Sequence, residues 1–419
     1  MAASALNGVV EGTGNEKPSK GVTFDDLYRT SSQYRIWSFT KDELLAKRIE
    51  TNKRGCQITL AKASKVKNPH TLMFESVDVE TLTIEEELLL INFFARKAVG
   101  LANMFKMPSQ VRGTAISFLK KFYLVNSVME YHPKNIMLTC LFLAAKVENY
   151  FISINTFSKK INNTTPESIL KYEYQIIKSL HFTLMVRHPF RSLYGFYLDL
   201  QDVMPRVDKN VIGKSYDKAR GVVNEAIMSD AIFLFTPPQI SLAAWRKADK
   251  ELIDRYLKKK FLKERKSKIK NGLVSIKEEK EDSASVSDSG SVTVKKEKEN
   301  ENDEKEAEDG DENDSEDEYR KNYQKLLEVI ENCENTIIDK NSREPSIDEA
   351  KLIGKKVHFC INPAKTFKRK REDADAETPG DNSLSVNSAA SKEHSSTAID
   401  LSEATKDTED EQESKRLKV

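Results

Sequence analysis

Lys146 is the residue whose setting most suggests chemistry, because it ends an apolar run in the stretch LFLAAKVENY (residues 141–150). An ionised lysine on a buried helix face is costly unless an acidic or polar group partners it. Such a partner could belong to this chain or to another protein. Alternatively, the side chain could snorkel to solvent from the end of an ordinary amphipathic helix. The run therefore predicts either a plain helix end or part of a binding site.

Patterns for catalysis and metal binding are missing from the sequence. It contains no GxxxxGK[ST] or GxGxxG loop to cradle phosphates, and no kinase catalytic-loop signature. The six histidines are scattered without metal-ligand spacing, and the four cysteines (Cys56, Cys140, Cys333 and Cys360) form no CxxC pair. We therefore expect no catalytic residues, no metal site, no cofactor and no disulfide scaffold.

Charge is nearly balanced over the 419 residues, with 67 Lys+Arg against 66 Asp+Glu, which argues against a uniformly basic nucleic-acid-binding protein. It is unevenly distributed, however: residues 258–270 carry a net charge of +7 and residues 301–318 a net charge of −11. Residues 262–318 and 368–419 also lack aromatic side chains. Such segments cannot bury enough apolar surface to offset the entropy of ordering, so we predict disorder there. No secretory signal or long apolar run is present, which predicts a soluble intracellular protein with no membrane partner.

The remaining sequence has the signals of helices. Capping boxes, in which a Ser or Thr is followed three residues later by Glu, predict helix starts at Thr40, Thr83 and Ser346. Prolines in the first turn predict two more helices, which begin after His132 and Thr165. No stretch alternates apolar and polar residues between turn signals, so the predicted fold class is all-α.

A short internal repeat indicates two similar helical domains. Pro, Ile and Leu have the same spacing in PKNIMLTCLFLAA (133–145) and in PPQISLAAW (237–245), and a helical stretch precedes each segment. The predicted organisation begins with a disordered N-terminus (1–23), an N-terminal helix with a linker (24–80) and a first repeat (81–188). A second repeat (189–340) with a disordered charged insert (262–318), a C-terminal helix (341–367) and a disordered tail (368–419) follow.

Three stretches resemble the cyclin family and, within it, the cyclin H group. FLKKFYLVNSVMEYHPKNIMLTCLFLAAKVEN (118–149) is similar to the second and third helices of the cyclin box, and SSQYRIWSFTKDELLAKR (31–48) to the helix that precedes the box. The segment that ends in INPAKTFKRKRE is similar in placement to the final helix and tail. The resemblance covers about 24–261 and 319–371 and implies two tandem five-helix cyclin-box repeats flanked by N- and C-terminal helices.

The resemblance also implies a function. Cyclins are not enzymes; they bind a cyclin-dependent kinase and push its mobile helix into the active position. The implied partners are the kinase of the CDK-activating complex, a RING-finger assembly factor and core transcription factor IIH. The implied output is phosphorylation of the RNA polymerase II C-terminal repeats in transcription initiation. Direct binding of nucleic acid is not expected.

In cyclins a lysine of the third box helix and a glutamate of the fifth converge on the backbone that leads into the kinase's mobile helix. Lys146 and Glu173 match these two residues. For Trp37, as for Phe39, packing on the chain's own core is the alternative to a kinase contact. The expected kinase-binding residues are Lys146, Glu173, Leu143, Val147, Ile177, Phe182, Leu184 and Trp37.

Two basic clusters in the tail predict nuclear import and therefore a nuclear protein, with solvated charge as the alternative. They consist of Lys368, Arg369, Lys370, Arg371, Lys415 and Arg416.

Two other functions stay open. The chain could be another transcriptional cyclin of the C or K type, which the Lys120–Lys121 pair in the second box helix would also suit. It could instead be a DNA-binding general factor with cyclin-like repeats, like transcription factor IIB. That factor would need a zinc ribbon, and this chain has no CxxC pair.

Overall fold

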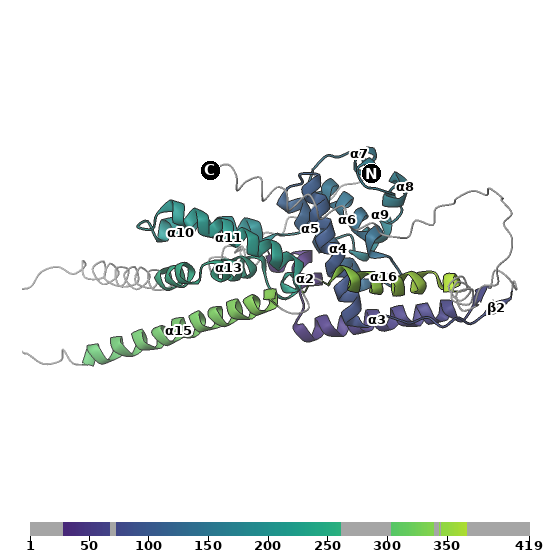
Figure 1. The fold of residues 1–419 in the computed structure, drawn as a ribbon. Coiled ribbons are helices and arrows are strands. Elements are labelled where there is room, and N and C mark those ends of the chain that lie inside the picture. The colour runs from purple at the N-terminus through teal and green to yellow at the C-terminus, as the bar shows by residue number, and fades with distance from the viewer. Residues whose placement is uncertain (1–27, 68–72, 261–302, 339–342, 344, 367–419) are drawn as a thin grey trace, which may run out of the picture.

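The computed structural model describes residues 28–67, 73–260, 303–338, 343 and 345–366, and only the backbone of 303–319. In this part, two helical bundles lie side by side, with one long helix along the edge of the first (Figure 1). The predictions for the N-terminus, for the tail and for both basic clusters lie outside the described residues.

The first bundle is built around two helices that are buried on nearly all sides, α5 (Ser109–Val125) and α6 (Pro133–Val147). Phe118 and Phe122 of α5 and Leu141 of α6 are fully buried, and the two helices pack against each other. Around this pair lie α4 (Ile84–Met104), α7 (Ile154–Lys159), α8 (Pro166–Leu170) and α9 (Glu173–Ser179).

The second bundle repeats this plan, with α11 and α13 in the places of α5 and α6, so the internal repeat is confirmed. Trp245 and Tyr256 lie at its centre. Buried Arg246 on α13 binds Glu334 of α15, which lies 88 residues later in the sequence, with an Nη1–Oε2 distance of 3.1 Å. Residues 250–260 are also helical. The elements are α10 (Pro189–Val203), α11 (Lys209–Met228), α12 (Ala231–Leu234), α13 (Pro237–Ala248) and α15 (Asp303–Ile338).

The flanking helices pack on the first bundle. Helices α2 (Ser32–Trp37) and α3 (Lys41–Ala63) precede it, and α16 (Ile347–Ile361) returns to lie beside α3 and α4 (Figure 1). Lys356 of α16 binds Glu86 at the start of α4, with an Nζ–Oε1 distance of 2.8 Å. The turn η2 (Pro363–Lys365) follows α16.

Several sequence predictions are confirmed and three need correction. Both bonds of the capping box form at Thr40, Thr83 and Ser346. The segment predicted as one helix from Pro166 is two helices, α8 and α9, separated at residues 171–172.

The second correction is a small antiparallel sheet of β1 (Val66–Lys67) and β2 (Phe74–Glu75), whose strands are too short to alternate visibly in the sequence. The third is that α15 begins at Asp303, inside the insert predicted to be disordered. A segment rich in Glu, Asp and Lys lacks the apolar residues to build a core, yet its backbone can still coil into a helix.

Candidate functional site

Lys146 and Glu173 meet on the surface of the first bundle. The Nζ of Lys146 donates a hydrogen bond to Oε1 of Glu173 at 2.5 Å, and the same ammonium lies 4.8 Å from the centre of the Phe142 ring. The Lys146 side chain is 45% exposed and that of Glu173 is 23% exposed. The lysine that ends the apolar run therefore reaches the surface, and its partner in this chain is the glutamate that the cyclin resemblance selects.

The two helices that carry the pair favour these charges. Lys146 lies in the last turn of α6, where the helix dipole favours a cation. Glu173 is the first residue of α9, where the dipole favours an anion and backbone N–H groups lack helical partners. The end of α6 and the start of α9 thus bring a donor and an acceptor to one point. An ammonium has three N–H donors, so Lys146 can bond a second acceptor while it holds Glu173.

The apolar residues predicted around the pair differ in exposure. Leu143 is buried in the core, and Val147, Ile177 and Leu184 are half-buried. Phe182 is 67% exposed. The predicted set therefore combines one core residue, three half-buried residues and one large aromatic ring exposed at the surface.

A strained turn presents Phe182 to solvent. His181 and Phe182 have φ values of 52° and 58°, a left-handed conformation that is uncommon for residues other than glycine. The amide N–H of Phe182 closes the turn on the carbonyl of Ile177 at 3.0 Å. Such conformations cost free energy and persist only where the surrounding structure holds them.

Trp37 provides part of that support from the interior. It is 3% exposed, and its indole Nε1 donates to Oγ1 of Thr183 at 2.9 Å. The amide of Phe39 donates to the carbonyl of Phe233 in the second bundle at 2.9 Å. These contacts match the alternative in which both residues pack on this chain, and Trp37 holds the segment that follows Phe182.

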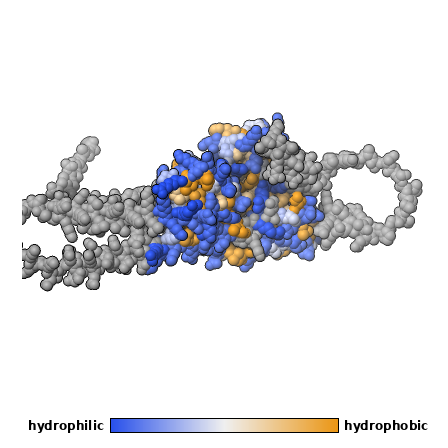
Figure 2. Space-filling model, turned by 60° about the vertical axis from the view of Figure 1, so that its left-hand side comes forward, coloured by the Kyte–Doolittle hydropathy of each residue, from blue (hydrophilic) through white to orange (hydrophobic). Residues whose placement is uncertain are grey.

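Sequence reasoning missed other apolar side chains near the ends of these helices. The surface in Figure 2 is mostly hydrophilic, with scattered hydrophobic patches. Phe151, in the loop after α6, is 94% exposed, Tyr174 next to Glu173 is 70% exposed, and Met185 is 70% exposed. Only Tyr174 lies in a helix, where its signal is an apolar residue out of phase with the buried face; Phe151 and Met185 lie in loops, where helical periodicity gives no signal.

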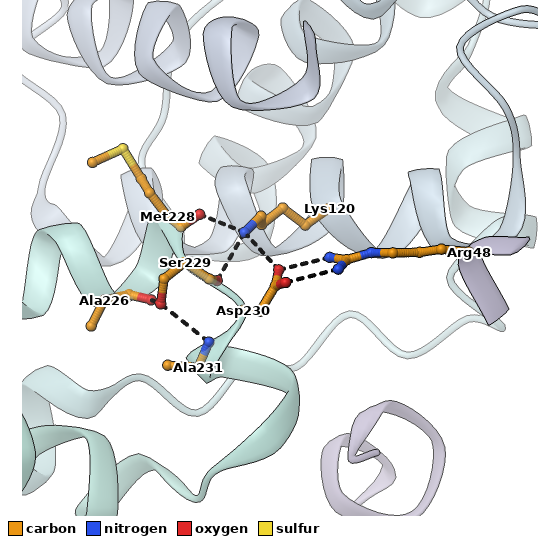
Figure 3. A network of polar contacts seen from close by, with 7 residues as sticks. All are labelled: Arg48, Lys120, Ala226, Met228, Ser229, Asp230 and Ala231. Atoms are coloured by element: carbon orange, nitrogen blue, oxygen red, sulfur yellow. Dashed lines mark hydrogen bonds and ion pairs between the residues drawn. The ribbon is translucent and has the colours of Figure 1, made fainter. Parts of the chain in front are cut away.

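A buried polar network fixes the two bundles and α3 relative to one another. Figure 3 shows Asp230, which follows α11, between Arg48 of α3 and Lys120 of α5. The Arg48 guanidinium binds both carboxylate oxygens, at 2.7 and 2.8 Å, and Lys120 Nζ donates to the carbonyl of Ser229 at 2.8 Å. Burial alone would raise the pKa of Asp230, but the two cations outweigh it and lower that pKa to about 2.

Neither a metal-ligand cluster nor a membrane-spanning helix occurs in the described ranges. No three His, Cys, Asp or Glu side chains there are grouped so that they could hold a metal ion. None of the helices described is both long and apolar enough to cross a bilayer.

Comparison with known proteins places both bundles in one family. Residues 88–185 match the family model "Cyclin, N-terminal domain", and residues 188–338 match "Cyclin C-terminal domain". Cyclin CCL1 of Saccharomyces cerevisiae is 44% identical over 255 residues, which are 59% of this chain and 65% of that protein. Cyclin-H of Xenopus laevis is 35% identical over 228 residues, which are 52% of this chain and 67% of that protein. The chain thus matches about two thirds of the length of each relative.

Two solved complexes contain similar chains. A chain in the cryo-EM structure of the yeast TFIIK (Kin28/Ccl1/Tfb3) complex is 33% identical, with a TM-score of 0.51 over 74% of this chain and 100% of that one. A chain in the CAK complex from Chaetomium thermophilum bound to ATP-gamma-S is 26% identical, with a TM-score of 0.60 over 86% of this chain and 99% of that one.

Proposed function

Because this chain belongs to the cyclin family, we propose that it is a cyclin H-type regulatory subunit that binds and activates a cyclin-dependent kinase. Cyclins are regulatory subunits of kinase complexes, not kinases themselves. The observation that carries the proposal is the Lys146–Glu173 pair on the surface of the first repeat, in a chain whose relatives are cyclins of this type.

The pair suits recognition of a peptide backbone. One ammonium donor and one carboxylate oxygen engage each other, and the remaining donors and lone pairs can bond the C=O and N–H groups of a partner segment. The half-buried and exposed apolar residues around the pair would exclude water from those bonds and strengthen them. Because the pair is preformed, binding would cost little ordering of these two side chains.

Activation would follow from where the partner segment lies in the kinase. A kinase is active only when the glutamate of its mobile helix reaches the lysine that holds the ATP phosphates. A rigid surface that binds the backbone before that helix favours the inward position and shifts the population of the kinase toward the active state. The chain described here supplies the rigid surface, and the kinase supplies the catalytic groups.

The wider assembly follows from the relatives. The yeast complex contains Kin28, Ccl1 and Tfb3, which supports a three-subunit module of kinase, cyclin and assembly factor for this chain as well. We infer that the assembly factor is of the RING-finger type, and that the module joins core transcription factor IIH and phosphorylates RNA polymerase II C-terminal repeats in the nucleus. The basic clusters at 368–371 and 415–416 are the import signals in this proposal.

The test is reconstitution. The full chain is mixed with the transcription-module kinase from the same cells, with and without the assembly factor, and phosphate transfer to a peptide of C-terminal repeats is measured. Activity that requires the chain would support the proposal. If the chain formed no complex with the kinase but bound duplex DNA in a salt-dependent way, the factor IIB-like function would replace it.

A further inference from the structure

A small cavity lies where the two bundles, α2 and the linker between the repeats meet. It is lined by residues from α2, α5, residues 186–189, α11, α12 and α13, and its volume is about 20 Å³. A cavity of this size holds one group about as large as a water molecule. It lies apart from the Lys146–Glu173 pair, and none of its lining residues belongs to the predicted kinase-binding set.

The polar groups that line this cavity are rich in donors. They are Gln33, Ser117, Lys121, Arg187 and His188, and the rest of the wall is apolar or glycine. Lys121 Nζ and Arg187 Nε are both fully buried, and neither has a hydrogen-bond partner among the described residues. No Asp or Glu lines the cavity. The buried Lys121 ammonium therefore borders this space without a compensating charge, and the Nε–H of half-buried Arg187 adds a donor without a partner.

Lys120, the neighbouring residue, shows what Lys121 lacks. Both lysines are buried on α5, and burial lowers the pKa of each to about 8, so both are charged at neutral pH. Lys120 has the Asp230 carboxylate at 3.5 Å and backbone carbonyls as acceptors. Lys121 has the face of Trp37 at 5.4 Å, which supplies no hydrogen-bond acceptor. A buried charge without a partner is strongly unfavourable, so a counter-charge is expected beside Lys121.

We propose that this cavity binds a small inorganic anion of the size of chloride, held by Lys121 and Arg187. A water molecule would satisfy the donors but would leave the charge of buried Lys121 uncompensated. A phosphate or sulfate is larger than the one water-sized group for which there is room.

The ion would act as a positioning device at the junction of the repeats. Gln33 of α2 already bonds the linker twice, through the amide of Arg187 at 2.7 Å and its carbonyl at 3.3 Å. His188 of the linker already lies 2.7 Å from Thr114 of α5, measured between Nε2 and Oγ1, and an anion between Lys121 and Arg187 would add a second link to α5. Binding would therefore stabilise the folded chain, and the gain would grow with the logarithm of the ion concentration once that concentration exceeds the dissociation constant.

The direct test uses bromide, which replaces chloride and scatters anomalously. Crystals of the full chain, or of its kinase complex, are grown with sodium bromide in place of sodium chloride. We expect an anomalous peak in the cavity, within hydrogen-bond reach of Lys121 Nζ. Ordinary water density at that point, without an anomalous peak, would overturn the proposal.

A solution test separates the site from general salt effects. Melting temperatures are compared in chloride and in gluconate, which is too large for the cavity, at equal ionic strength. We expect chloride to raise the melting temperature of the wild type by a few degrees and to lose that effect in Lys121→Met. The control Lys218→Met removes an exposed lysine of α11 and should keep it. An equal chloride effect in Lys121→Met would contradict the proposal, and if that variant fails to fold, the bromide peak in the wild type decides.

Discussion

Replacement of Asp230 by Asn tests the network that joins α3 and the two bundles. The substitution keeps the shape of the side chain but removes the charge that Arg48 binds through two hydrogen bonds and that Lys120 approaches. The fold lowers the pKa of Asp230 from 3.8 to about 2. At about 1.4 kcal/mol per pKa unit, this corresponds to roughly 2 kcal/mol of stability at neutral pH. The variant also leaves two buried cations without their anion, so we expect a total loss of about 3–4 kcal/mol.

Urea unfolding of the wild type and of Asp230→Asn at pH 7 measures this loss. The matched control is Glu50→Gln, because Glu50 forms an exposed ion pair with Lys47 at 4.0 Å and should change stability by less than about 0.5 kcal/mol. The folded-state pKa of Asp230 lies below its unfolded value, so its contribution is full above about pH 4 and is lost as the pH falls toward 2. A loss below about 1 kcal/mol at pH 7, or one that does not shrink in acid, would refute this reasoning.

Three further predictions concern packing, pH and binding. Gly55→Ala should destabilise the chain by more than about 2 kcal/mol in urea unfolding, because a Cβ there would lie 2.5 Å from Ser127. The control is Gly213→Ala, whose Cβ meets nothing within 4 Å and which should be neutral or stabilising. Burial lowers the pKa of His188 to about 4, so as the pH falls the unfolded chain takes up a proton before the folded chain does. Stability should therefore fall as the pH drops from 6.5 toward 4. Urea midpoints measured over this range should fall less steeply for His188→Gln than for the wild type. Phe182→Ala should leave the melting temperature unchanged, since the ring is 67% exposed, and weaken kinase binding about 30-fold in calorimetric titration; unchanged affinity would remove Phe182 from the interface.

Local signals in the sequence predicted the helices well. A capping box depends on two residues three positions apart, so Thr40, Thr83 and Ser346 could be identified as helix starts without knowledge of the fold. The internal repeat likewise predicted two similar helical domains. The Lys146–Glu173 pair was found through the cyclin resemblance, since 27 residues separate its members.

Contacts between distant segments could not be predicted in this way. Lys120 and Lys121 are identical neighbours in the sequence, yet one has a carboxylate partner and the other borders a cavity. Asp230 lies 182 residues from Arg48, and no local pattern indicates their pairing. The exposure of Phe182 depends on a left-handed turn of two residues other than glycine, for which propensity gives no signal.

The kinase affinity of Lys146→Glu tests the central claim most directly. The lysine is 45% exposed, so reversal of its charge should leave the fold intact. It would place the new carboxylate beside that of Glu173 in the proposed kinase-binding site. We expect the dissociation constant for the kinase to rise at least about 100-fold, whereas Lys218→Glu, on the exposed surface of the second bundle, should bind like the wild type. Wild-type affinity in a folded Lys146→Glu variant would contradict the assignment of this pair as the kinase-binding site.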